Sequence, residues 1–149
     1  MSFPVRQAGP ATMQQAGPVS VLVADDNPEH REMLGEVLSL MMPGVRTLFA
    51  GDGLDAVSVA SDVVPWAVIL DLDMPVLDGL EAAVRLRERM GDEVPVLIAL
   101  SGDHERLRGA YSVFDYSLRK PLDVQRLARY LSRAMVFTRE SRNCGAAEP

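Results

Sequence analysis

The sequence contains little cysteine, little histidine and no long uninterrupted apolar run. Cys144 is the one cysteine among 149 residues, which excludes an internal disulfide framework and is typical of a reducing compartment. The apolar runs are too short for a signal peptide or a membrane span, so we expect a cytoplasmic protein without a membrane partner. The two histidines, His30 and His104, fall just inside expected helix starts, where we interpret them as surface residues. No Ser–His or Cys–His pair is therefore placed for hydrolytic catalysis.

Negative charge exceeds positive charge in this chain. The 21 acidic side chains outnumber the 15 basic ones, which gives a formal net charge of −6. Such a chain has no electrostatic reason to bind nucleic acid or an anionic membrane. A length of 149 residues also fits one domain with a substantial core but not two. The sequence therefore predicts no direct DNA binding and no separate output domain.

The chain divides into a patterned central region and two ends without periodicity. Residues 1–18 mix proline, glycine, glutamine and alanine, and we interpret them as a flexible arm. Residues 138–149 are interpreted as a flexible tail, which leaves residues 19–137 as the expected domain. This domain contains five short apolar runs, each followed by an amphipathic stretch: 19–24, 45–50, 66–70, 94–100 and 115–119.

This alternation predicts an α/β fold. Apolar strands that are each followed by a helix imply a parallel sheet whose two faces are both covered. Right-handed crossovers then produce a doubly wound, five-stranded parallel sheet with helices on both faces. We expect the flavodoxin-like strand order 2-1-3-4-5.

Polar side chains stand where the expected strands end. Asp25 and Asp26 end the first strand, and Asp71 ends the third. Ser101 ends the fourth strand and Lys120 ends the fifth. Because ligands of an open parallel sheet bind outside the carboxyl ends of its strands, we expect these five side chains to meet at one edge.

The residue types in this set indicate phosphoryl chemistry. Carboxylates held close together repel one another unless a cation compensates, and a site of oxygen ligands with spare coordination positions suits Mg²⁺. A carboxylate beside Mg²⁺ can attack phosphorus and form an acyl phosphate. Lys120 would then neutralise the phosphoryl oxygens, and the Ser101 hydroxyl would donate to one of them.

Four segments, in order, resemble the CheY-like receiver domains of response regulators in two-component signalling: DD (25–26), VILDLDMPVLDG (68–79), LIALSG (97–102) and RKP (119–121). The resemblance implies Mg²⁺ as cofactor and the phosphohistidine of a sensor histidine kinase or histidine phosphotransfer protein as donor. It also implies a downstream protein partner and allows a homodimer. The protein would be a phosphoacceptor with slow autodephosphorylation rather than a turnover enzyme.

The resemblance assigns a role to each site residue. Asp71 corresponds to the phosphorylated aspartate, and Ser101 and Lys120 correspond to the hydroxyl and the ammonium that contact its phosphoryl group. Three further aspartates would complete the Mg²⁺ site with Asp71: Asp26 as a direct ligand, Asp25 largely through water, and Asp73 through its backbone carbonyl.

Two features depart from the family pattern. The family often has an aromatic residue three positions before the lysine, but Ser117 occupies that position here and Tyr116 precedes it. Strand alternation sends these two side chains to opposite faces of the sheet. The segment between Ser101 and Lys120 is also shorter than usual, which predicts a short or irregular fourth helix and does not support a dimer of the usual kind.

Two other functions remain open at this point. The Asp71-Leu72-Asp73 segment imitates the nucleophile motif of haloacid-dehalogenase-type phosphatases. Those enzymes place the motif near the N-terminus with a second acidic pair downstream, whereas here the acidic pair lies upstream. The other alternative is a receiver-fold interaction module that binds partners without phosphorylation.

Overall fold

The computed structural model describes residues 19–147, so the flexible arm predicted for residues 1–18 lies outside the described residues, as do residues 148 and 149. Five strands alternate with helices along this part of the chain. The strands are β2 (Ser20–Ala24), β3 (Arg46–Ala50), β4 (Ala67–Asp71), β5 (Val96–Ser101) and β6 (Tyr116–Arg119). The helices are α1 (Pro28–Met41), α2 (Gly53–Val63), α3 (Gly79–Met90), the short 3₁₀ helix η1 (Gly91–Glu93), α4 (His104–Ala110) and α5 (Val124–Ala147).

The strands form one parallel sheet in the order β3-β2-β4-β5-β6. This is the order 2-1-3-4-5 when the strands are counted along the chain, so the predicted doubly wound α/β fold is confirmed. β2 and β4 are neighbours although α1, β3 and α2 separate them in sequence. Ala24 pairs with Leu70, so the residues that follow them, Asp25 after the end of β2 and Asp71 as the last residue of β4, arrive at the same edge of the sheet.

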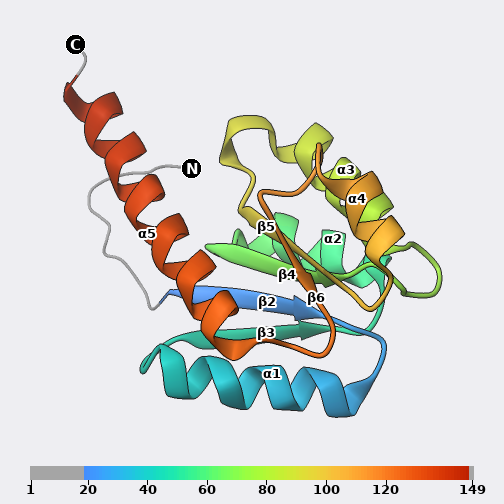
Figure 1. Cartoon of the computed structure of the whole chain (residues 1–149). Helices are drawn as coiled ribbons and strands as arrows, with labels where there is room; N and C mark the ends of the chain where they lie inside the picture. Colours follow the sequence, from blue (N-terminus) through green and yellow to red (C-terminus); the bar gives the residue numbers. More distant parts are fainter. Residues whose placement is uncertain (1–18, 148–149) are drawn as a thin grey trace.

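Helices cover both faces of the sheet (Figure 1). On one face, α1 and α5 pack four buried leucines against alternate strand residues: Leu34, Leu38, Leu127 and Leu131. On the other face, α2, α3 and α4 bury small and apolar side chains against the remaining strand residues. Each fully buried leucine stabilises the fold by about 1.5–3 kcal/mol relative to an exposed one. This burial holds the strand ends in fixed positions.

Polar caps begin the helices that follow the strand ends. Asn27, Asp52, Asp78 and Asp103 occupy the N-cap positions of α1 to α4, and each side chain accepts backbone N–H groups of the first helical turn. Asp123 accepts the N–H of Arg126 at 3.1 Å at the start of α5. These caps satisfy N–H groups that have no partner inside the helix. The caps therefore fix the residue at which each helix begins, a short distance along the chain from the edge of the sheet.

α4 is short, as the reduced spacing between the fourth and fifth strand ends predicted. It has 7 residues and ends at Ala110. Arg87 of α3 supports the connection that follows, because its guanidinium donates to the carbonyl of Val113 and to the carboxylate of Asp115. The same Oδ2 of Asp115 also accepts the N–H of Leu97 at 2.8 Å, which ties the connection to β5.

α5 extends further than the sequence suggested. It continues to Ala147, so most of the flexible tail predicted for residues 138–149 is helical. An established helix adds residues at little cost, and no proline interrupts this one before Pro149. Among residues 19–147, no helix combines the length and apolar character that crossing a bilayer requires.

Candidate functional site

Asp71 lies at the end of β4 and is only 2% exposed. Its Oδ1 accepts the N–H of Asp73 and its Oδ2 accepts a hydrogen bond from Nζ of Lys120, both at 2.9 Å. Burial raises the pKa of Asp71 above its ordinary value of 3.8, and the hydrogen bonds from Asp73 and Lys120 offset only part of that effect. The Asp71 carboxylate is therefore short of compensating positive charge.

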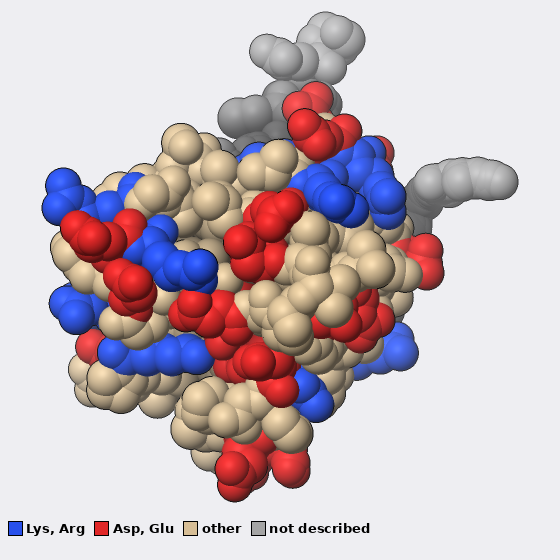
Figure 2. Space-filling model, turned by 90° about the vertical axis from the view of Figure 1, so that its right-hand side faces the viewer, with Lys and Arg blue, Asp and Glu red and all other residues tan. Residues whose placement is uncertain are grey.

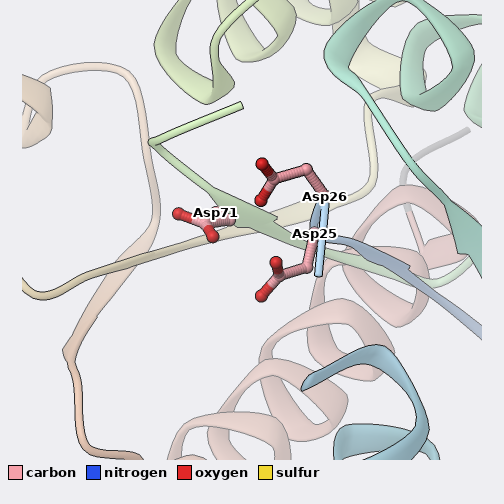
Figure 3. Close-up of side chains that lie close together, drawn as sticks. All are labelled: Asp25, Asp26 and Asp71. Atoms are coloured by element: carbon pink, nitrogen blue, oxygen red, sulfur yellow. The ribbon is translucent and has the colours of Figure 1, made fainter. Parts of the chain in front are cut away.

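Two more carboxylates meet Asp71 at this edge. Asp25 is 1% exposed, and its Oδ1 accepts the N–H of Asn27 at 2.9 Å. Asp26 is exposed. One oxygen from each of Asp25, Asp26 and Asp71 lies within 4.8 Å of the other two, and Figure 3 shows the three side chains at the adjoining ends of β2 and β4. Their mutual repulsion is a cost that a bound cation would remove.

Lys120 supplies positive charge directly after β6. Its Nζ lies 2.9 Å from Oδ2 of Asp71 and 3.8 Å from Oδ2 of Asp25. Burial alone would lower the pKa of Lys120, but the hydrogen bond and charge of Asp71, followed by the charge of Asp25, raise it above 10.5. The ammonium is therefore charged at neutral pH and bridges the two buried carboxylates. The bond from Lys120 to Pro121 is a cis peptide.

The carboxylate cluster fits a hard divalent cation. Oδ2 of Asp25 is buried, yet within residues 19–147 it accepts no hydrogen bond, although Nδ1 of His30 lies 3.5 Å from it. Mg²⁺ prefers oxygen ligands and retains several waters, and the exposed Asp26 leaves one side of the cluster open to solvent. Asp25, Asp26 and Asp71 are thus the side chains that would hold such an ion.

Ser101 and Asp73 reach the same edge by different means. Ser101 ends β5, the neighbour of β4, and its fully buried hydroxyl oxygen accepts the N–H of Asp103 at 3.0 Å. Asp73 contributes its backbone N–H to Asp71, whereas its side chain lies outside the carboxylate cluster and pairs with Arg106. The structure therefore brings together all the predicted site residues, with Asp73 present through its main chain. The individual roles assigned to them stay predictions.

Tyr116 lies on the face of the sheet opposite to the Ser101 side chain. It packs with the cluster formed by α1 and α5, and its ring stacks on Tyr130 of α5 with centroids 4.7 Å apart. Ser101 follows Ala99, which packs with α2, α3 and α4, and alternation places both on that face. Position 117 is a serine, and Tyr116 is a partly buried residue that packs on the α5 face.

Sequence reasoning missed two arginines that contact the site. Arg31 of α1 donates to the carbonyl of Asp25 at 2.6 Å, and Arg106 of α4 contacts Leu72 and Asp73. Neither stands at a strand end, which was the pattern that identified the other residues. Figure 2 shows the face at the carboxyl ends of the strands, where acidic side chains gather in a central band that basic side chains border.

Comparisons with known proteins agree with this geometry. Residues 21–132 match the family model of the response regulator receiver domain. Response regulator MprA of Mycobacterium bovis (strain BCG / Pasteur 1173P2) is 36% identical over 132 residues, which cover 87% of this chain and 55% of that protein. The CheY-like receiver domain from Methylobacillus flagellatus has a TM-score of 0.72 and 27% identity, over 79% of this chain and 99% of that chain. The signal receiver domain of a DNA binding response regulator protein from Colwellia psychrerythraea 34H shares the fold, with a TM-score of 0.71 and 23% identity over 78% of this chain and 98% of that chain.

The prediction of no direct DNA binding is wrong. It rested on a net charge of −6 and on a length that fits one domain, and both properties describe the receiver alone. The chain spans about half the length of the curated relatives it matches, between 47% and 55%, and one of the similar receivers comes from a DNA binding response regulator. The acidic charge of a receiver domain therefore does not exclude DNA as a partner of the protein that contains it.

Proposed function

Because this chain belongs to the family of response regulator receiver domains, we propose that its carboxylate at Asp71 accepts a phosphoryl group from a phosphohistidine in a Mg²⁺-dependent reaction. The main support for this proposal is the geometry around Asp71. The Asp71 carboxylate is buried, and its Oδ2 accepts a hydrogen bond from Nζ of Lys120 at 2.9 Å. An oxygen of Asp71 also lies within 4.8 Å of an oxygen of Asp25 and an oxygen of Asp26. A buried nucleophile with an adjacent ammonium and a cation-binding cluster is the arrangement that phosphoryl transfer requires.

In the proposed reaction, one oxygen of Asp71 forms a bond to phosphorus while the bond from phosphorus to the donor imidazole nitrogen breaks. The histidine leaves with the bonding electron pair and takes up a proton. The N–H of Asp73 and Nζ of Lys120 hold the Asp71 carboxylate in position, and Lys120 neutralises charge on the transferring oxygens. The sensor histidine kinase or histidine phosphotransfer protein only has to present the phosphohistidine.

Asp25, Asp26 and Asp71 are the side chains proposed to hold Mg²⁺, with the backbone carbonyl of Asp73 as a further ligand. When bound, Mg²⁺ supplies positive charge that compensates both the carboxylates and the phosphoryl oxygens. The buried Oδ2 of Asp25, which lacks a hydrogen bond among the described residues, supports this assignment.

Phosphorylation is proposed to change the surface around α4. The Ser101 hydroxyl accepts the N–H of Asp103, and the Asp103 side chain caps α4 by accepting the N–H groups of Glu105 and Arg106. If the hydroxyl of Ser101 turns to donate to a phosphoryl group on Asp71, the cap of α4 shifts with it. A downstream protein that contacts α4 would then distinguish the two states.

The proposed protein is a phosphoacceptor with slow loss of the phosphoryl group, and not a turnover enzyme. Its donor obtains phosphoryl groups from ATP inside the cell, so we place its action in the cytoplasm. A phosphatase of the haloacid dehalogenase type would release phosphate repeatedly, whereas a phosphorylation-independent interaction module would never form the acyl phosphate. Both alternatives are outcomes of the experiment below.

Intact-mass spectrometry after incubation with Mg²⁺ and acetyl phosphate tests the proposal. We expect wild type to gain a labile adduct of about 80 Da, one phosphoryl group, and Asp71→Ala to gain none. Asp26→Asn should slow the reaction and weaken its dependence on Mg²⁺, while the matched exposed control Asp92→Asn should behave as wild type. An unmodified wild type that still binds Mg²⁺ would favour the interaction module, and steady release of phosphate would favour the phosphatase.

A further inference from the structure

Arg106 connects helix α4 to the loop that follows β4 at the edge of the site. Its Nη1 donates to Oδ1 of Asp73 and, at 3.3 Å, to the carbonyl of Leu72. Leu72 and Asp73 are the two residues that directly follow Asp71. A guanidinium from α4 therefore holds the segment of chain next to the proposed phosphoacceptor, on the side opposite to β2 in the strand order.

Asp73 is a fourth carboxylate near the proposed acceptor. Its N–H donates to Oδ1 of Asp71 at 2.9 Å, which fixes its backbone beside the acceptor. Its charge also reaches the site. Burial lowers the pKa of Lys120, but Asp71, Asp25 and also Asp73 raise it. The side chain of Asp73 is 57% exposed, so without a partner its carboxylate would be free to turn towards an approaching donor.

An additional negative charge at this place opposes the proposed reaction. The phosphoryl group carries negative charge, and the three carboxylates of the site already balance the positive charge of Lys120 and of the proposed Mg²⁺. Charges a few ångströms apart near a protein surface interact strongly enough to change a rate severalfold. An ion pair that neutralises Asp73 and directs its carboxylate towards α4 would remove this repulsion.

We propose that Arg106 is a positioning residue for phosphorylation, which acts by pairing with the carboxylate of Asp73 and keeping it away from the incoming phosphoryl group. This inference rests on the proposed phosphoacceptor function of Asp71. The contacts of Arg106 at the site are made by Nη1 and go to Asp73 and to the Leu72 carbonyl, neither of which is a reacting atom, so the role proposed for Arg106 acts through Asp73. Lys120 is the cation that contacts the acceptor itself.

The test measures the rate of phosphorylation by acetyl phosphate with Mg²⁺ in a double-mutant cycle. We expect Arg106→Gln to slow the reaction by about three- to tenfold, because the Asp73 charge is released. In an Asp73→Asn background, the same Arg106→Gln change should alter the rate by less than about twofold, because the charge that Arg106 neutralises is already absent. Arg106→Lys, which keeps the positive charge, should recover most of the wild-type rate.

Ionic strength separates this electrostatic role from a purely structural one. The ratio of wild-type to Arg106→Gln rates should fall towards one as salt rises from about 50 mM to about 500 mM, because salt screens exposed charges. The unfolding midpoint of Arg106→Gln should stay within about 3 °C of wild type, since exposed ion pairs contribute little stability.

Three results would overturn the inference. Equal rates for wild type and Arg106→Gln would show that the ion pair has no effect on the reaction. Slowing by Arg106→Gln that persists in the Asp73→Asn background would show that Arg106 acts without Asp73. In both cases wild type still forms the labile adduct, whereas a wild type that forms none removes the proposed function itself and the role of Arg106 with it.

Discussion

Replacing Asp71 by asparagine should stabilise the protein in the absence of Mg²⁺, although the substitution removes an ion pair. At 2.9 Å the attraction between Asp71 and Lys120 is about 6 kcal/mol with an effective dielectric constant of about 20. On the same scale the buried carboxylate of Asp25, within 4.8 Å, repels Asp71 by about 3–4 kcal/mol. Asp26, at a similar distance, repels Asp71 by less because its carboxylate is exposed to solvent. Attraction and repulsion therefore nearly cancel.

The burial of the Asp71 charge then decides whether Asp71→Asn raises or lowers the free energy of unfolding. Burial is the largest cause of the raised pKa of Asp71, and it disfavours the charged form. Asparagine has nearly the same shape and keeps an oxygen that can accept the N–H of Asp73. We expect the free energy of unfolding to rise by about 1–2 kcal/mol at neutral pH.

Urea denaturation in EDTA measures this change. With a slope of about 2 kcal/mol/M, the midpoint should rise by about 0.5–1 M with an unchanged slope. With about 10 mM Mg²⁺ the higher stability of Asp71→Asn relative to wild type should shrink. A cation held by the carboxylates stabilises wild type, whereas Asp71→Asn has lost one of the carboxylates that hold it. Asp92→Asn is the control, and we expect it to change stability by less than about 0.5 kcal/mol.

The pH dependence supplies an internal check on the sign. Because the folded-state pKa of Asp71 is raised, its favourable contribution is fully present below the ordinary value of 3.8 and is lost as pH rises through the folded-state pKa. The difference between Asp71→Asn and wild type should thus be largest near neutral pH and disappear below that value. If Asp71→Asn is equally stable or less stable than wild type in EDTA at neutral pH, the reasoning is refuted.

Five further substitutions test the structure around the site by urea denaturation. Gly79→Ala should destabilise by at least about 2 kcal/mol, because an added Cβ would lie 2.3 Å from the carbonyl oxygen of Asp71. Gly109→Ala, which meets no atom within 4 Å in α4, should instead stabilise by about 0.5–1 kcal/mol, and equal effects at the two sites would contradict this account. Val76→Gly and Val64→Gly should each stabilise by about 1 kcal/mol, since both valines have positive φ, 69° and 53°; a loss at both positions would show that neither backbone is strained. Lys120→Met should lower the free energy of unfolding by about 2–3 kcal/mol in EDTA, and Mg²⁺ should reduce this difference from wild type. A difference that does not change with Mg²⁺ would argue against a cation site.

The alternation of apolar and amphipathic segments was enough to predict the fold. The three central strands, β2, β4 and β5, carry near-continuous apolar runs, and a parallel sheet that is covered on both faces buries them. The strand order follows from right-handed crossovers and the winding reversal between β2 and β4. The α5 boundary could not be predicted in this way, because nothing in residues 138–147 forces the helix to end or to continue.

The strand-end pattern was likewise enough to predict which residues share the site. Asp25, Asp71, Ser101 and Lys120 each follow or end a strand, so the sheet itself brings them to one edge. The direction of the Asp73 side chain had no such signal, since a residue in a loop can turn either way. The partner of that side chain, Arg106, depends on how α4 packs on the sheet.

What the sequence determined by itself is the local periodicity, the helix caps and the chemical type of each strand-end residue, because these depend on neighbours along the chain. Only the tertiary structure decided the charge balance of the site. The position of Lys120 between Asp71 and Asp25, the burial that raises the pKa of Asp71, and the pairing of Arg106 with Asp73 all depend on distances between residues remote in sequence. Electrostatic energies vary steeply with distance and burial, and the packing of separate elements sets both.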